Sequence, residues 1–252
     1  MTSIRILIIG GGVVGCAAAA ELATRWDNVF LVEQLPRLGM ATSTRNSGVL
    51  HSGLYYPPGS LKARHCVAGN RLSYEFCSAH NVPHRRTSKL IVAASPGEEL
   101  RLSLLAENGR ANGVEGLRLI DRAAIRVREP HIAGHTALDV PSAGIVSSEE
   151  LVKAYARVAQ DRGASLLTHA RVTRLEPQRD SIYVSIQVGS IEDPSRITEE
   201  TVEAACVVNA AGLYADEVAA LLGNHRFRIY PVRGEYCELV RSKSHLVQSL
   251  VY

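Results

Sequence analysis

The N-terminal stretch constrains the fold of this chain more than any other part of the sequence. An apolar run, IRILII at residues 4–9, is followed directly by a glycine-rich segment, GGGVVG at residues 10–15. Small residues continue as CAAAAEL at 16–22, which predicts a closely packed helix. A strand, a glycine-rich turn and a helix in this order are typical of the start of a dinucleotide-binding βαβ unit.

Each glycine of this turn has a predicted role. Gly10 permits the tight turn, Gly12 lets the backbone approach a pyrophosphate, and Gly15 lets the helix pack closely on the strand. The helix N-terminus, which includes Val13 and Val14, offers N–H groups and the positive end of its dipole to the phosphates. The turn is therefore predicted to bind the phosphates of a dinucleotide.

A second strand and an acidic residue strengthen this interpretation. Residues 29–32, VFLV, predict the strand, and Glu33 and Gln34 follow it. A carboxylate at position 33 can accept hydrogen bonds from both ribose hydroxyls of an adenosine and would repel a 2′-phosphate. The alternative, an ordinary α/β turn, does not require the acid, so the sequence favours a dinucleotide.

Composition describes an ordinary globular protein. The 252 residues suffice for one large domain or two interlocked ones, and 46% of them are hydrophobic. The formal net charge is only +3, and Arg85 and Arg86 are the one adjacent basic pair. Without a basic stripe that is interleaved with aromatic residues, no nucleic-acid partner is predicted.

Cysteine and histidine spacing suggests neither a metal site nor a disulfide framework. The five cysteines form no CxxC pair and no cluster with histidine at ligand spacing, so reduced thiols are expected. A secretory signal is not recognised, and no apolar run approaches the roughly 20 residues of a membrane span. We expect a cytoplasmic protein, and peripheral contact with the inner face of a membrane is compatible with the sequence.

A polar segment after the second strand predicts a further part of the cofactor site. It is rich in hydroxyl and amide side chains, which can bind phosphates and a flavin ring; the alternative is a solvated loop. An enzyme that binds only NAD would usually continue into its next βα unit, so the insertion favours FAD. The residues are Thr42, Ser43, Thr44, Arg45, Asn46, Ser47 and Gly48.

The next run is the most specific motif of the chain: RNSGVLHSGLYYPPGSLKA at residues 45–63. With SKLIVA at 88–93, GIV at 144–146, VNAAGLYAD at 208–216 and PVRGEY at 231–236, it resembles the FAD-dependent D-amino-acid-oxidase-like superfamily. Within that superfamily the chain is most similar to the L-2-hydroxyglutarate dehydrogenases and oxidases. The resemblance covers essentially the whole chain, and the 45–63 run is much more specific than the glycine motif.

The resemblance implies an α/β fold with a Rossmann-like FAD-binding domain and an inserted α+β substrate domain. We assign residues 1–85 and 145–224 to the first, and residues 86–144 and 225–252 to a part of the second. Members of the family carry a further segment after the stretch that matches here. We therefore expect a C-terminally truncated fold, with a missing C-terminal segment or subunit.

Local patterns predict several elements outside the nucleotide motif. Residues 60–80 predict a helix capped by Ser60, and the next helix, which a capping box at 95–98 opens, is expected to stop at the Asn-Gly pair 108–109. Residues 181–188 and 201–204 predict a hairpin joined by a loop that contains Gly, Asp and Pro. Residues 206–212 predict a separate buried strand, and alternation at 228–239 predicts a long one.

The resemblance also implies roles for individual residues. Val172, whose backbone would meet the adenine, and Ala210, Ala211 and Gly212 match cofactor contacts of the family; for the last three, tight helix packing is the alternative. His51 is the candidate base, since imidazole titrates near neutral pH. It can instead only hydrogen-bond the flavin or its loop. Candidates to hold substrate carboxylates, or to act structurally, are Tyr55, Tyr56, Lys62 and Arg233.

The function implied is FAD-dependent oxidation of a 2-hydroxy acid, namely L-2-hydroxyglutarate to 2-oxoglutarate, with transfer of electrons to a quinone or to oxygen. Two alternatives stay open. The same flavin fold can oxidise an amino acid or glycerol 3-phosphate, and a truncated chain can be a non-catalytic nucleotide-binding remnant or subunit. An enzyme that uses only NAD ranks behind these.

Overall fold

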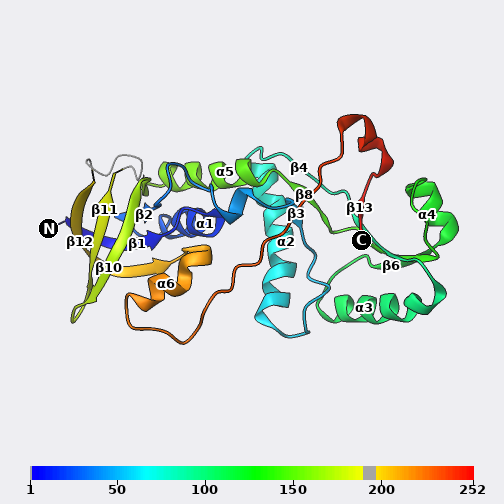
Figure 1. Cartoon of the computed structure of the whole chain (residues 1–252), viewed down its shortest axis with the longest axis horizontal. Helices are drawn as coiled ribbons and strands as arrows, with labels where there is room; N and C mark the ends of the chain where they lie inside the picture. The colour runs from blue at the N-terminus through cyan, green and yellow to red at the C-terminus, as the bar shows by residue number, and fades with distance from the viewer. Residues whose placement is uncertain (1, 190–196) are drawn as a thin grey trace. The chain divides into compact units, whose positions relative to one another are not determined.

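The computed structural model describes residues 2–189 and 197–252. The chain divides into two compact units (Figure 1). Unit 1 comprises Met1–Asn46 and Ser148–Gly234, and unit 2 comprises Ser47–Ser147 and Glu235–Tyr252. The loop predicted to join the hairpin strands falls mostly on 190–196, outside the described residues.

Unit 1 is built on a six-stranded sheet whose centre is the N-terminal strand. Strands β12, β1, β2 and β9 are parallel, and β10, β11 and β12 are antiparallel. The predicted Rossmann-like start is confirmed. In sheet order the strands are β10 (Ala170–Pro177), β11 (Ile182–Val188), β12 (Thr198–Asn209), β1 (Thr2–Ile9), β2 (Val29–Val32) and β9 (Ser165–Leu167).

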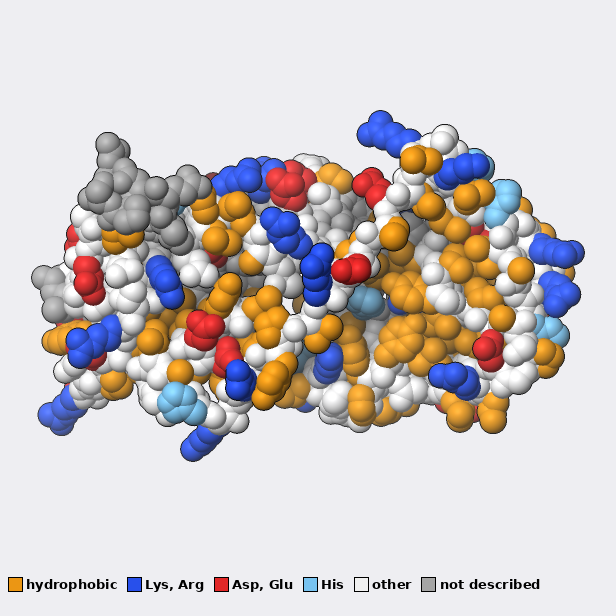
Figure 2. Space-filling model, viewed as in Figure 1, with side chains coloured by type: hydrophobic (Ala, Val, Ile, Leu, Met, Phe, Trp, Pro, Cys, Tyr) orange, Lys and Arg blue, Asp and Glu red, His pale blue; other side chains and the backbone are white. Residues whose placement is uncertain are grey.

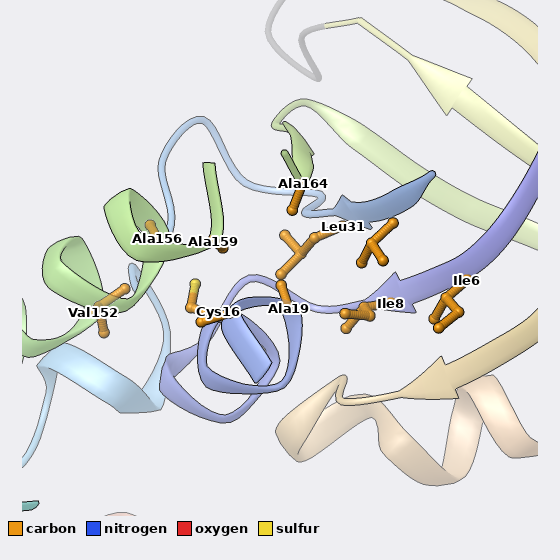
Figure 3. Packing of buried hydrophobic residues seen from close by; sticks show 11 residues of the cluster. Ile6, Ile8, Cys16, Ala19, Leu31, Val152, Ala156, Ala159 and Ala164 are labelled. Atoms are coloured by element: carbon orange, nitrogen blue, oxygen red, sulfur yellow. The ribbon is translucent and has the colours of Figure 1, made fainter. Parts of the chain in front are cut away.

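Helices α1 (Val13–Leu22) and α5 (Ser148–Asp161) cover one face of this sheet. Figure 3 shows Cys16 and Ala19 of α1 between Ile8 of β1 and Ala156 of α5. The small side chains of α1 allow it to lie close to the sheet, which holds the glycine turn firmly at the end of β1. The other helices of unit 1 within the described residues are short: η1 (Thr42–Thr44), η4 (Gly212–Tyr214) and α6 (Ala215–Ala220).

The opposite face of the sheet has its own core. Alternate residues of β1, Leu7 and Ile9, point to this face and pack with Leu175, Val184 and Ile186 from the antiparallel strands. Because both faces are covered, β1 is almost continuously apolar, as expected for a central parallel strand.

Unit 2 contains two small sheets and three α-helices. The predicted helix 60–80 is confirmed as α2, and the Ser60 side chain caps it by accepting a hydrogen bond from the Ala63 N–H. The first sheet consists of β13 (Leu250–Val251), β5 (Lys89–Ala93), β7 (Thr136–Val140) and β6 (Arg118–Asp121), and the second of β3 (Val49–Leu50), β8 (Gly144–Val146) and β4 (His84–Arg85). The helices are α2 (Leu61–Ala79), η2 (Pro96–Glu98), α3 (Glu99–Ala111), α4 (Arg122–Arg128) and η5 (Arg241–Leu246).

A buried carboxylate attaches the last strand to unit 2. Glu129 is fully buried and accepts hydrogen bonds from the N–H groups of Gln248 and Ser249. β13 then pairs in parallel with β5, and the Val92 N–H donates to the carbonyl of Tyr252. These bonds hold the aromatic ring of Tyr252 beside the start of β5.

The long strand predicted at 228–239 is wrong. The structure assigns no strand to this stretch, and both the even and the odd positions are exposed: Val232 is 92% exposed and Leu239 61%. Alternation becomes a strand only where the backbone finds a partner. Here the Ile229 N–H instead donates to the Asp216 carboxylate.

Two boundaries also differ from prediction. Helix α3 passes through Gly109 because this residue packs against Leu117 and Leu54, and it ends only before the second Asn-Gly pair, where Gly113 has φ +85°. The capping box is not formed: Glu98 accepts from the Ala94 N–H, while the Ser95 side chain makes no cap.

The segment 201–212 also differs from prediction, and the compact units are bounded differently from the domains assigned above. Residues 201–204 and the predicted buried strand after them form one continuous strand, β12, in which Cys206 and Asn209 are exposed. Residues 47–85, expected with the nucleotide half, belong to compact unit 2, since strand β3 pairs with β8. Whether these units coincide with an FAD-binding and a substrate domain stays a prediction.

Candidate functional site

The glycine turn at the end of β1 is shaped by two close approaches of the backbone. Gly10 has φ +111°, and a Cβ there would lie 2.5 Å from the carbonyl oxygen of Ala210. A Cβ on Gly15 would collide with the carbonyl oxygen of Gly10 and lie 3.1 Å from its carbon. Only glycine fits at these two positions, as predicted.

The N-terminus of α1 follows this turn directly. Gly12 is the N-cap without a side-chain cap, and the first turn contains no acidic residue. The Val13 N–H donates to Ser43 Oγ at 2.9 Å, and the apolar side chain of Val14 is 69% exposed. The positive end of the helix dipole, with no acidic residue beside it, attracts an anion.

Glu33 lies beside the turn and is fixed by backbone donors. Its two carboxylate oxygens accept hydrogen bonds from the N–H groups of Gly11 at 2.7 Å and Leu35 at 2.8 Å. Each oxygen has a second lone pair, so the carboxylate can still accept the hydroxyls of a ribose. Next to Glu33, Gln34 continues the chain toward the start of β10, where the Ala170 N–H donates to the Glu33 carbonyl.

Replacement of Glu33 by alanine is expected to weaken FAD binding and to lower stability. The change leaves two backbone donors without their carboxylate acceptor, and hydrogen bonds to charged groups contribute about 1.5–3 kcal/mol each. Titration with FAD and thermal unfolding measure both effects. Glu21→Ala is the matched control, because Glu21 is an exposed residue of α1 whose partner is exposed Arg25. Equal losses in the two variants would contradict the role given to Glu33.

The polar segment after β2 is held mainly by its own side chains. Thr44 donates to the Gly39 carbonyl, and Arg45 donates to that of Met40. Asn46 donates to two carbonyls within the segment. Ser43 Oγ accepts the hydrogen bond from the Val13 N–H of α1. The segment is thus a shaped loop, and direct contact of Thr42 and its neighbours with a cofactor stays a prediction.

The end of β12 lies against the glycine turn. The Ala210 N–H donates to the Ile9 carbonyl at 2.9 Å, which brings the predicted residues Ala210 and Ala211 beside Gly10. Gly212, with φ +57°, then starts η4. Val172 lies on β10 next to a register shift between this residue and Arg174. The carboxyl ends of parallel strands β12, β1 and β2 therefore meet at one edge, where open α/β sheets bind ligands.

In unit 2, the backbone of His51 is fixed by helix α2. Its carbonyl accepts hydrogen bonds from Asn70 Nδ2 at 3.1 Å and from Cys66 Sγ at 3.6 Å. The side chain is exposed, yet partial burial of the ring, and secondly the charge of Lys89, lower its pKa from the ordinary 6.5. A neutral imidazole at physiological pH is suited to accept a proton.

The loop that carries Tyr55 and Tyr56 is clamped by two asparagines of α3. Asn108 donates to the carbonyls of Leu54 and Tyr56, and Asn112 donates to those of Gly53 and Tyr56. The Lys62 ammonium lies 4.8 Å from the centroid of the Tyr56 ring. The structure therefore brings these predicted residues into unit 2 with His51.

A residue that the sequence analysis did not single out joins this group. Lys89, the first residue of β5, is fully buried, and its ammonium lies 5.2 Å from the centroid of the Tyr55 ring. The signal in the sequence was a single charged residue at the start of an apolar strand, KLIVA.

The remaining predicted residues divide between the units. Ser47 and Gly48 belong to unit 2, where the Gly48 carbonyl accepts from the Val146 N–H at 2.8 Å. Arg233 belongs to unit 1 and lies on the exposed stretch after α6. The structure thus forms two groups of candidate residues, one for a nucleotide in unit 1 and one around His51 in unit 2.

Among the described residues, no group of three or more His, Cys, Asp or Glu side chains is arranged to hold a metal ion. No helix in that part of the chain has the length and apolar character to cross a membrane. On the face shown in Figure 2, the coloured Lys and Arg side chains are scattered rather than gathered in one stripe.

Comparison with known protein families gives one match that spans nearly the whole chain. Residues 5–251 match the model of the family described as FAD dependent oxidoreductase. Three curated relatives are L-2-hydroxyglutarate dehydrogenases: those of Bos taurus, Homo sapiens and Indibacter alkaliphilus are 40%, 38% and 34% identical over 100%, 100% and 98% of the chain. The chain spans only 55%, 55% and 60% of their lengths.

Solved structures show the same fold. L-alpha-glycerophosphate oxidase from Mycoplasma pneumoniae, with FAD bound, matches with a TM-score of 0.78 and 29% identity. The match covers 88% of this chain and 57% of the oxidase. Glycine oxidase from Geobacillus kaustophilus matches with a TM-score of 0.72 at 23% identity, over 88% of this chain and 59% of its own, which supports the fold alone.

Proposed function

Because the chain belongs to the family of FAD-dependent oxidoreductases, we propose that it oxidises a 2-hydroxy acid, L-2-hydroxyglutarate, to 2-oxoglutarate. The observation that carries the proposal is the 34–40% identity to L-2-hydroxyglutarate dehydrogenases along essentially the whole chain. FAD is the cofactor of the family, in agreement with the sequence prediction.

The nucleotide group of unit 1 fits the ADP half of FAD. The N-terminus of α1, whose first turn contains no acidic residue, offers N–H groups for the pyrophosphate. Gly12 leaves the space that a side chain would fill, since a Cβ there would lie 3.0 Å from Ser43 Oγ. Glu33, whose carboxylate is fixed by the Gly11 N–H, is the proposed acceptor for the ribose hydroxyls. We propose that these residues, with the loop 42–46 and the end of β12, bind the cofactor.

In the proposed reaction, the cofactor accepts a hydride and the protein accepts a proton and binds the substrate. When bound, FAD supplies the acceptor for the hydride that leaves the substrate Cα. A ring nitrogen of His51 accepts the hydroxyl proton, which its lowered pKa favours because the imidazole is neutral before reaction. Tyr55, Tyr56, Lys62 and Arg233 are the proposed partners of the substrate carboxylates.

The electron acceptor and the cellular compartment are also part of this proposal. A quinone or oxygen would receive the electrons, as the sequence analysis expected. The cytoplasm stays the predicted compartment; the bovine and human relatives are named mitochondrial, whereas the name of the Indibacter relative states no compartment.

Glycerol 3-phosphate is the competing substrate that a specific observation favours. The M. pneumoniae oxidase is 29% identical, so its fold and part of its sequence are shared. Its identity is nevertheless lower than that of each dehydrogenase cited above.

A substrate panel separates these possibilities. The purified chain is loaded with FAD, freed of oxygen, and mixed in turn with L-2-hydroxyglutarate, glycerol 3-phosphate and glycine. Loss of the visible absorbance of oxidised flavin with the first compound alone supports the proposal. Loss with one of the other compounds but not with the first assigns a different substrate, and no loss with any of them favours a nucleotide-binding remnant or subunit.

A further inference from the structure

The ammonium group of Lys89 is buried without an acceptor. The residue is fully buried, and its Nζ is one of the enclosed polar atoms that make no hydrogen bond within the described part of the chain. Lysine is almost never fully buried unless it is paired. A partner for this ammonium is therefore expected from outside the part of the chain that the structure describes.

Aromatic rings enclose this ammonium on two sides. Nζ lies 4.1 Å from the centroid of the Tyr252 ring and 5.2 Å from that of Tyr55. Tyr252 is held there by its pairing with β5, and Tyr55 by the loop that Asn108 and Asn112 clamp. The rings attract a cation, but cation–π contacts contribute only about 0.5–2 kcal/mol each.

Asp139 of the neighbouring strand β7 pairs with other residues. In the antiparallel pairing of β5 with β7, Lys89 lies opposite Val140 and Leu90 lies opposite Asp139. Adjacent residues of a strand point to opposite faces, so Asp139 lies on the other face from Lys89. Asp139 is paired at 2.8 Å with both Arg118 and Arg128.

The ammonium of Lys89 also acts on the candidate base, His51. The charge of Lys89 acts on the ring of His51 and on the thiol of Cys66, and all of these residues belong to unit 2. A buried ammonium without a counter-ion is costly, and an anion that enters beside it removes that cost. The substrate expected next to His51 carries carboxylates.

We propose that Lys89 is the counter-ion of a carboxylate of the substrate, held ready for it between the rings of Tyr55 and Tyr252. This inference rests on the proposed function and deepens it, because it makes the site selective for 2-hydroxy acids over uncharged alcohols. Tyr55 then has a second role beside the one proposed above, since its ring lies against the ammonium of Lys89 and orients it.

The test measures carboxylate binding rather than turnover. FAD-loaded protein is titrated with 2-oxoglutarate by calorimetry, as wild type and as Lys89→Met, which removes the charge but keeps an unbranched side chain. We expect at least about 30-fold weaker binding in the variant, since loss of one partner of a buried charge pair has effects of this size. FAD affinity is expected to be unchanged, because the nucleotide residues lie in unit 1.

Lys153→Met is the matched control. Lys153 is an exposed residue of α5 that pairs with Glu149 and Glu150, so 2-oxoglutarate binding should equal that of the wild type. In the absence of ligand, Lys89→Met is expected to unfold at the same temperature or higher, because a buried unpaired charge is removed. If Lys89 served only to hold the two rings together, Lys89→Met would instead unfold at a lower temperature than the wild type.

A second measurement uses the wild-type chain and does not depend on the variant's folding. The sequence contains four lysines, at positions 62, 89, 153 and 243, so labelling of the lysine ε-carbons gives few NMR signals. Addition of 2-oxoglutarate should shift the Lys89 signal and leave those of Lys153 and Lys243 in place. Lysine-to-methionine variants at the other three positions assign Lys89 by elimination.

The outcomes separate this inference from the proposed function. Equal binding by wild type and Lys89→Met, an unmoved Lys89 signal, or no binding of 2-oxoglutarate by wild type overturns the inference. If L-2-hydroxyglutarate nevertheless reduces the flavin, the proposed function survives. If the carboxylate site behaves as expected but the hydroxy acid leaves the flavin oxidised, the inference stands and the proposed oxidation fails.

Discussion

Gly15→Ala is expected to weaken FAD binding by this chain strongly. The added methyl group would collide with the carbonyl oxygen of Gly10 and lie 3.1 Å from its carbon, and both atoms are backbone. No flexible side chain can yield, so α1 must move away from β1 or the turn must open. Because either movement displaces the donors at the helix N-terminus, affinity for FAD should fall by roughly two orders of magnitude, about 2.7 kcal/mol.

Titration of the apoprotein with FAD measures this effect, and Gly69→Ala is its matched control. Gly69 lies within α2, and a Cβ there meets nothing within 4 Å. The control should bind FAD normally and gain about 0.5–1 kcal/mol of stability, since alanine favours a helix interior. Wild-type affinity in Gly15→Ala would contradict the described turn.

His51→Ala is expected to slow flavin reduction strongly while leaving FAD bound. Removal of a general base lowers rates by about 10²–10⁴-fold. The loop should keep its conformation, because Asn70 and Cys66 bind the backbone carbonyl of residue 51 rather than its ring. Stopped-flow reduction by L-2-hydroxyglutarate measures the rate.

His65→Ala provides the comparison for this variant. His65 is an exposed residue of α2, and its removal should leave the reduction rate unchanged. A wild-type rate in His51→Ala would support the alternative that this histidine only hydrogen-bonds the flavin or its loop.

The pH dependence of reduction follows from the lowered pKa of His51. The base must be neutral, so the rate should fall as pH decreases through a pKa that lies below the ordinary 6.5. Partial burial is the larger cause and the charge of Lys89 the smaller one. Lys89→Met should therefore move the acid limb upward, toward 6.5 but not beyond it. An acid limb that moves downward in this variant would contradict the assignment.

Contiguous motifs of the sequence were the most predictive of the fold. The β1 strand, the glycine turn, α1, β2 and Glu33 lie within 33 residues, and each local preference agrees with the next. The Ser60 cap is equally local and was confirmed. The pattern at 228–239 failed because alternation does not specify a partner strand, and Gly109 failed as a helix stop because packing against Leu117 outweighs its propensity.

Only those parts of the candidate site that have a local sequence motif could be predicted. Gly10, Gly15 and Glu33 have local signatures. By contrast, Asn108 binds a carbonyl 54 residues away, and the ring of Tyr252 reaches Lys89 from the far end of the chain. Such contacts depend on the tertiary fold and correspond to no recognisable spacing in the sequence. The position of Lys89 between the rings of Tyr55 and Tyr252 could therefore not be predicted.

A single turnover without oxygen tests the central claim most directly. FAD-loaded protein is mixed with excess L-2-hydroxyglutarate, the flavin spectrum is followed, and the quenched mixture is analysed for 2-oxoglutarate. We predict that reduced flavin and 2-oxoglutarate appear in equal molar amounts and at the same rate. A flavin that stays oxidised, or one that is reduced without formation of 2-oxoglutarate, would contradict the account.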